Sequence, residues 1–309
     1  MAFKYLEISI LALAWVLPPN GAHAINLECS EGLGPQSQIE FVDAISLSVA
    51  DKLLDAGDLF GAQEAIRDSA ASATEPQCNY SNDELRRRLL IARVEVFRGQ
   101  VGDARIHYAN LVKPITTRYG SLSEVALLTR IRLANIRLEQ GEATEALKDL
   151  IQIQGDFQLV STPSKHLAIQ VGRSLAVALA MNGDGPKASA IASGLHAIAP
   201  ESGDGYSLDS ADVDELIAAL LTRDDAPAKA LLLQSRAYVY RAAHSSGNNL
   251  ALLTSLWRVG YSLNQVGRTQ VAQEIFESID RRIGDSVDPA YARLKIQVES
   301  RLGNISAQY

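Results

Sequence analysis

Apolar residues along this chain recur at helical spacing and are interrupted by short turns. Leu127, Ile131 and Leu138 follow one another at spacings of four and seven places before one such turn, which places them on one face of an α-helix. Tyr108 and Phe276 each lie four places after an alanine, on the same predicted helix face as that alanine. No segment alternates apolar and polar residues over several positions with turn chemistry at its ends, so we expect no β-sheet. The pattern predicts an all-α fold.

The turns between the predicted helices recur every 42 residues. The turn residues are Gly57, Gly99, Gly141, Gly183, Asp225 and Gly267. An alanine follows five places after each turn, at Ala62, Ala104, Ala146, Ala188, Ala230 and Ala272. A small residue precedes each turn by seven places, at Ala50, Ala92, Ala134, Ala176, Ala218 and Gly260. Two columns in one phase identify an internal repeat that runs without a gap.

The two columns of small residues indicate close packing of paired helices. Two helices joined by a short turn can approach closely only where their facing side chains are small. Glycine at the turn accepts the positive φ that follows the end of a helix, and aspartate at 225 tolerates that region better than most residues. The chain is therefore predicted to be an array of antiparallel helix pairs.

The turn glycine, the alanine five places later and the large residue four places beyond it resemble the tetratricopeptide repeat. The best match is ALLTRIRLANIRLEQGEATEAL, residues 126–147. The 42-residue period is similar to that of the kinesin-light-chain class of these repeats. The resemblance implies a right-handed superhelical solenoid over residues 37–309, with about six helix pairs. A last helix that begins at Pro289 is expected to cap the array.

The first 24 residues have the features of a secretory signal peptide. Ile8 to Leu17 form an apolar run of ten residues, and Ala22-His23-Ala24 supplies a cleavage site of the small-x-small type. The run is shorter than the roughly 20 residues that span a bilayer. We expect an exported protein whose mature chain begins at Ile25, periplasmic in a Gram-negative cell or otherwise secreted.

Two cysteines lie near the predicted mature N-terminus. Cys29 is in a glycine- and proline-containing arm, residues 25–36, and Cys78 is in the first loop between repeats. In an exported protein two cysteines are more often bridged than free, and two unpaired thiols are the alternative. We expect a disulfide between them.

Charge and motifs argue against several classes of function. The net charge is -7 and no block of basic residues occurs, which disfavours nucleic-acid binding. The motifs of zinc proteases, P-loop enzymes, serine hydrolases and CxxC redox proteins do not occur, and the four histidines beyond the signal share no ligand spacing. We expect no enzyme, no cofactor and no metal.

One acidic run stands out, from Asp204 to Glu215, within residues that also include Asp209, Asp212 and Asp214. The run lacks the loop spacing of a calcium site. Asp209 is predicted to cap a helix, and the macrodipole favours acids in a first helical turn.

The resemblance implies that the first helix of each pair lines a concave groove. Arginine and asparagine gather at the groove positions, and arginine can bind carboxylates through two hydrogen bonds. The candidate binding residues are Arg86, Arg93, Arg132, Asn135, Arg173, Trp257, Arg258, Tyr261 and Asn264. Trp257 and Tyr261 could instead belong to the core, and arginine is also a good helix former on an exposed face.

These residues predict a protein-binding scaffold or adaptor. Its partner would be a protein or peptide, with an acidic or C-terminal segment bound in the groove. The alternative is a structural subunit of an envelope assembly or secretion machinery, which would use a broad outer face.

Overall fold

The computed structural model describes residues 47–54, 59–69, 81–199, 206–244, 249–284 and 289–307. The predicted signal peptide, the arm and both cysteines lie outside these residues. Within them every regular element is a helix. Residues 47–54 are helical, and the helices that follow are α3 (Leu59–Asp68), α4 (Asn82–Phe97), α5 (Val101–Tyr119), α6 (Glu124–Glu139), α7 (Ala143–Gln158), α8 (Lys165–Met181), α9 (Gly185–Ile198), α10 (Leu208–Arg223), α11 (Pro227–His244), α12 (Leu250–Gln265), α13 (Thr269–Ile283) and α14 (Pro289–Ser306).

The turns lie where the repeat predicts them. Every predicted turn residue within the described part of the chain has a positive φ, from 57° at Asp225 to 86° at Gly183. All the alanines of the two columns are completely buried. At Gly260, which takes the place of an alanine, a Cβ atom would lie 2.9 Å from the ring of Phe276. The close approach of the paired helices is therefore confirmed.

The first helices from α4 onward, α4, α6, α8, α10 and α12, each begin with a side-chain cap. The oxygens of Ser81, Ser123, Ser164 and Asn249 each accept a hydrogen bond from a backbone N–H in the first turn, and this bond stabilises a helix by about 1 kcal/mol. The prediction that Asp209 caps α10 is wrong. Ser207 is extended, and its hydroxyl accepts from the N–H of Ser210 at 3.1 Å.

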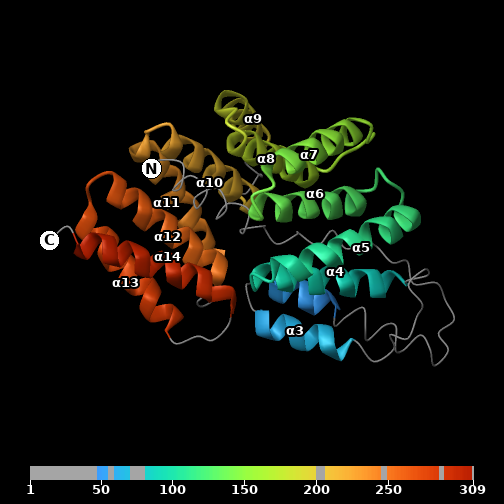
Figure 1. The fold of residues 1–309 in the computed structure, drawn as a ribbon, viewed down its shortest axis with the longest axis horizontal. Coiled ribbons are helices and arrows are strands. Elements are labelled where there is room, and N and C mark those ends of the chain that lie inside the picture. Colours follow the sequence, from blue (N-terminus) through green and yellow to red (C-terminus); the bar gives the residue numbers. More distant parts are fainter. Residues whose placement is uncertain are drawn as a thin grey trace.

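The helix pairs follow one another around an arc (Figure 1). In Figure 1 α6, α10 and α12 lie toward the inside of the arc, and α7, α9, α11 and α13 lie outside. The first helices also contact one another along the array, α6 with α8 and α8 with α10. We call the surface formed by α4, α6, α8, α10 and α12 the first-helix face.

The two ends of the array share one hydrophobic core. Residues 47–66 at one end and residues 250–305 at the other belong to a single apolar cluster, whereas α6 to α10 build a separate one. Because the middle of the array is not part of the shared cluster, the ends contact each other directly. In Figure 1 one end of α14 faces the ends of α3 and α4 near the centre of the view. The arc is closed.

Candidate binding face

The predicted groove arginines other than Arg86 are buried, and carboxylates of neighbouring repeats bind several of them. Arg93 on α4 bonds to Asp51, and half-buried Arg86 lies 3.6 Å from the same carboxylate. Arg173 on α8 donates to Asp212 on α10 at 3.1 Å. These guanidinium groups therefore join the repeats to one another.

A network of buried charges connects α8, α10, α11 and α12. Glu215 on α10 accepts from Arg241 on α11, from Arg258 and, at 2.8 Å, from the hydroxyl of Ser255 on α12. Arg241 also donates to Asp212. Both carboxylates are fully enclosed. A buried ion pair is costly to break because the remaining charge keeps no partner.

The network keeps Glu215 ionised. Burial alone would raise its pKa, but the charges of Arg241 and Arg258 and the hydrogen bond from Ser255 outweigh burial, so the pKa falls to about 2. At Asp212 burial has the larger effect and raises the pKa, although Arg173 and Arg241 lower it. The pKa of Glu215 therefore lies below its ordinary value, and the pKa of Asp212 lies above its ordinary value.

A third buried carboxylate on α10 binds a different set of groups. Asp214 accepts two hydrogen bonds from Arg236 on α11, both 2.7 Å long, and one from the hydroxyl of Tyr206 at 2.5 Å. His196 on α9 lies 3.7 Å from it. The sequence attributed the acidic run to the helix macrodipole. Three of its members, Asp212, Asp214 and Glu215, are instead buried and bonded to other groups of this chain. In the described part of the chain no three histidine, cysteine or acidic side chains converge as metal ligands would.

The remaining predicted groove residues in the first half of the array are also enclosed. Arg132 on α6 is buried, and burial lowers its pKa. The nearby Tyr108 hydroxyl has its pKa raised, again mainly by burial. Asn135 is buried in the same helix.

Three of the four predicted groove residues of α12 come together at a small cavity. Trp257, Arg258 and Tyr261 line it together with Ala219 and Thr222 of α10 and Gln234 of α11. The cavity is small, with a volume of about 10 Å³, which is room for about one water molecule. Asn264, the last predicted residue, is half-buried on the next turn of α12.

The aromatic walls of this cavity are held in place from α14. The rings of Trp257 and Tyr261 stack with their centroids 5.5 Å apart. The guanidinium carbon of Arg301 lies 4.6 Å from the centre of the Tyr261 ring, a cation–π contact. Both alternatives for these rings therefore hold in part. Trp257 and Tyr261 are buried, and they also line the cavity on the first-helix face.

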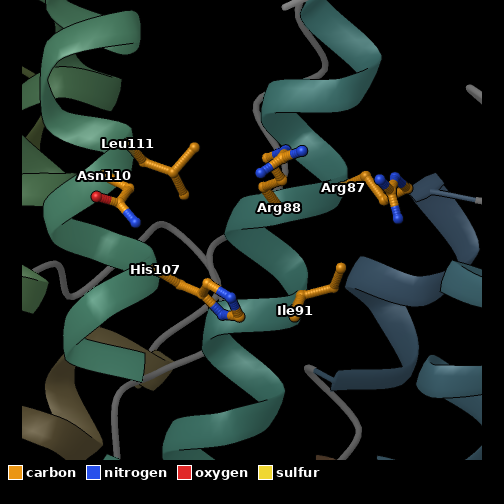
Figure 2. Close-up of a pocket in the computed structure, with 6 residues that line it drawn as sticks. All are labelled: Arg87, Arg88, Ile91, His107, Asn110 and Leu111. Carbon is orange, nitrogen blue, oxygen red and sulfur yellow. The ribbon is translucent and has the colours of Figure 1, made fainter. Parts of the chain in front are cut away.

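A larger cavity lies between α4 and α5. Figure 2 shows its walls, which are Arg87, Arg88, Ile91, His107, Asn110 and Leu111, around a volume of about 230 Å³. Glu84 bonds to both arginines, with the Nε of Arg87 at 2.7 Å. Glu95 lies 2.7 Å from the Nδ1 of His107. None of these wall residues was predicted to form a site. Glu84 pairs with Arg87 and Arg88, and Glu95 pairs with His107, so neighbouring carboxylates balance the basic groups of the wall.

No protein-family model and no curated protein sequence matches the chain. Among solved structures, a Rap protein complexed with Competence and Sporulation Factor is similar over 98% of this chain and 84% of its own, at 10% identity and a TM-score of 0.65. The chain has a tetratricopeptide-like α-solenoid fold.

Two other repeat structures are also similar over part of their arrangement. TPR-like repeats of a putative kinesin light chain from Podosopora anserina match 65% of this chain and 97% of their own, at 22% identity and a TM-score of 0.45. The TPR2AB domain of yeast Sti1 with pHSP90 matches 86% and 99%, at 12% identity and a TM-score of 0.35. The fold conclusion depends on the Rap structure and on the helix pairs themselves.

Proposed function

We propose that this chain is a protein-binding scaffold that holds a segment of its partner on the first-helix face, at the step between α10 and α12. The observation that carries this proposal is the cavity there, where Trp257 and Tyr261 lie at groove positions of α12. Buried, preordered aromatic rings in a pocket are typical of the residues that dominate protein interfaces. The Rap structure, similar in fold, is itself a complex with another molecule.

The proposed binding mode differs from the one that the sequence suggests. Arg93, Arg173 and Arg258 already bind carboxylates of this chain. Binding an acidic partner through them would require breaking buried ion pairs, at a cost of several kcal/mol. An acidic segment is therefore a less favourable ligand than a segment that uses the aromatic cavity.

The proposal includes export and binding rather than catalysis. The sequence of residues 1–24 supports export, and N-terminal sequencing of the mature protein from fractionated cells should find Ile25 first. The positive φ at Gly99, Gly141, Gly183, Asp225 and Gly267, spaced 42 residues apart, supports placing these repeats in the 42-residue class. None of the described helices is both long and apolar enough to cross a bilayer.

A separate observation supports a second candidate function. Several aliphatic side chains on the outer second helices are exposed, above all Leu232 at 72% and Val239 at 65%, two turns apart on α11. Exposed aliphatic residues in register on one helix favour docking of another surface. This supports the alternative of a structural subunit held through its outer face.

Site-specific photo-crosslinking separates the two functions. A photoreactive residue in place of Asn264 reports on the first-helix face, and one in place of Leu232 reports on the outer face. The scaffold proposal expects an adduct in the native compartment from position 264 that disappears when Tyr261→Ala is added. Adducts from position 232 alone would contradict it and favour the structural subunit.

A further inference from the structure

Arg132 on α6 is a buried cation without a carboxylate partner. The residue is 9% exposed, and within the described part of the chain no carboxylate lies at ion-pair distance from its guanidinium. Arg93 and Arg173, on the neighbouring first helices, each bind a carboxylate of this chain. A buried charge that has no partner destabilises a fold, so its presence at Arg132 requires an explanation.

The groups around Arg132 do not neutralise it. The Tyr108 hydroxyl beside it is neutral, and Arg93 has a like charge. Asp51 also acts on Arg132, but it lies beyond ion-pair distance and is already bonded to Arg93. Burial and the Arg93 charge lower the pKa of Arg132, yet an arginine remains charged in proteins. The guanidinium therefore keeps a positive charge that the described residues do not balance.

Asn135 lies three residues after Arg132, on the same face of α6. It is 5% exposed, and its amide makes no hydrogen bond within the described part of the chain. The polar atoms of both side chains reach solvent, whereas the unbonded Nε1 of Trp257 is enclosed. Two neighbouring side chains are thus held by their surroundings while their polar ends stay open to a ligand.

We propose that Arg132 and Asn135 bind one carboxylate of the partner. A guanidinium can donate two parallel hydrogen bonds to the two oxygens of a carboxylate, and the Asn135 amide can donate a third. One negative charge matches the one guanidinium that has no carboxylate. A phosphate dianion would bring a surplus charge near Asp51, and a neutral group would leave the guanidinium unbalanced.

The inference depends on the proposed function and adds a second contact to it. Arg93, Arg173 and Arg258 already bind acids of this chain, so this face accepts a single carboxylate rather than an acidic run. Two first helices, α8 and α10, lie between α6 and α12. At about 10 Å between neighbouring helices, the two contacts lie roughly 30 Å apart along the face, which about nine extended residues span.

The test compares two small probes that differ only in their last group. N-acetylglycine ends in a carboxylate, and N-acetylglycinamide ends in a neutral amide. Each is titrated at constant ionic strength into the full chain with ¹⁵N-labelled arginine and asparagine, and Arg132→Met and Asn135→Ala identify the two side-chain signals. We expect saturable shifts of both signals with N-acetylglycine, and binding at least tenfold weaker for N-acetylglycinamide and for inorganic phosphate.

Two variants decide whether Arg132 binds a ligand or only supports the fold. Arg132→Met should abolish the response of the Asn135 amide to N-acetylglycine without lowering the Tm of the free chain, because an unbalanced buried charge is removed. Arg67→Met, at an exposed site on α3, makes the same change in net charge and should alter neither quantity. If Arg132→Met fails to fold, Arg132→Lys provides the second test. It keeps the charge but loses the paired donors, so binding should weaken three- to tenfold.

The inference is overturned if N-acetylglycine gives no saturable shift, or if N-acetylglycinamide or phosphate binds as tightly. It is also overturned if Arg132→Met binds N-acetylglycine as well as the unchanged chain, or has a lower Tm. In each of these cases, adducts from position 264 that depend on Tyr261 would leave the scaffold function standing. A normal response to N-acetylglycine without such adducts would reject that function, and with it the partner as the source of the carboxylate.

Discussion

Arg93 and Asp51 occupy the same position in consecutive repeats, 42 residues apart, and their side chains are bonded to each other. A residue of one repeat thus binds its own counterpart in the repeat before it. The buried charges of this fold follow the repeat, as its alanines and turns do. Glu215 and Arg258, 43 residues apart, make the equivalent connection further along the array.

Removing one partner of the first pair should therefore separate two repeats. Arg93→Ala is expected to lower the free energy of unfolding by about 3 kcal/mol, because the largely buried carboxylate of Asp51 then keeps only the more distant and more exposed Arg86. Urea unfolding followed by circular dichroism measures the loss. The exposed pair Arg67–Glu64 gives the control, since Arg67→Ala should change stability by less than about 0.5 kcal/mol. Equal effects in the two variants would contradict the interpretation.

Acid should destabilise the protein through Glu215. Its pKa is about 2 in the folded chain against an ordinary value of 4.5, so its contribution of about 3 kcal/mol is complete above pH 4.5. It is lost as the pH falls from 4.5 to 2. Unfolding experiments across this range should show a steep decline that Glu215→Gln makes shallower.

Asp212 should have the opposite effect on stability when the pH is lowered in the same unfolding experiment. Burial raises its pKa, so its protonation favours the folded state and restores part of the stability as the pH falls. Asp212→Asn removes this contribution, and its stability should decline more steeply in acid than that of the unchanged chain. A shallower decline would show that Asp212, not Glu215, carries the loss.

The turn glycines should be intolerant of a side chain even where space is available. At Gly141 a Cβ atom would meet nothing within 4 Å, but φ is 80°. Gly141→Ala is expected to cost about 1 kcal/mol because of the backbone alone. Gly102 lies inside α5 with the same free space and no positive φ, so Gly102→Ala should stabilise by up to about 1 kcal/mol. Thermal unfolding of both variants tests whether the backbone, rather than crowding, sets the cost.

The apolar cluster shared by the two ends predicts that damage at one end spreads to the other. Val298 on α14 is completely buried in the cluster that also contains Leu59 and Ile66 of α3. Val298→Ala should accelerate hydrogen exchange in residues 59–69, more than 200 positions away in sequence. Val239→Ala, at an exposed site on α11, is the control. Unchanged exchange in α3 would show that the ends open independently.

The fold could be predicted because its signals are local and repeated. A positive-φ glycine and an alanine at a helix crossing are constraints within one helix pair, and six copies make them visible. The partners of the arginines could not be predicted in the same way. Asp212 and Glu215 are the fifth and eighth residues of α10, beyond the first turn where the macrodipole acts, and only the stacking of α11 and α12 brings Arg241 and Arg258 to them.

The candidate site was predicted in part. The sequence placed Trp257 and Tyr261 on the first-helix face, but Gln234 belongs to a second helix that groove positions do not include. Whether polar atoms find partners depends on ångström-scale distances between three helices. A search for opposite charges 42 or 43 residues apart would have found Asp51 with Arg93 and Glu215 with Arg258.

The joined ends of the array also constrain how the gene for this chain can change. An open solenoid gains or loses whole repeats freely, since each unit needs only its neighbours. Here an inserted or deleted 42-residue unit would displace the last helices from the first and expose the apolar cluster that they share. The number of repeats is part of the fold, and relatives that keep this core should vary in their loops rather than in their count of helix pairs.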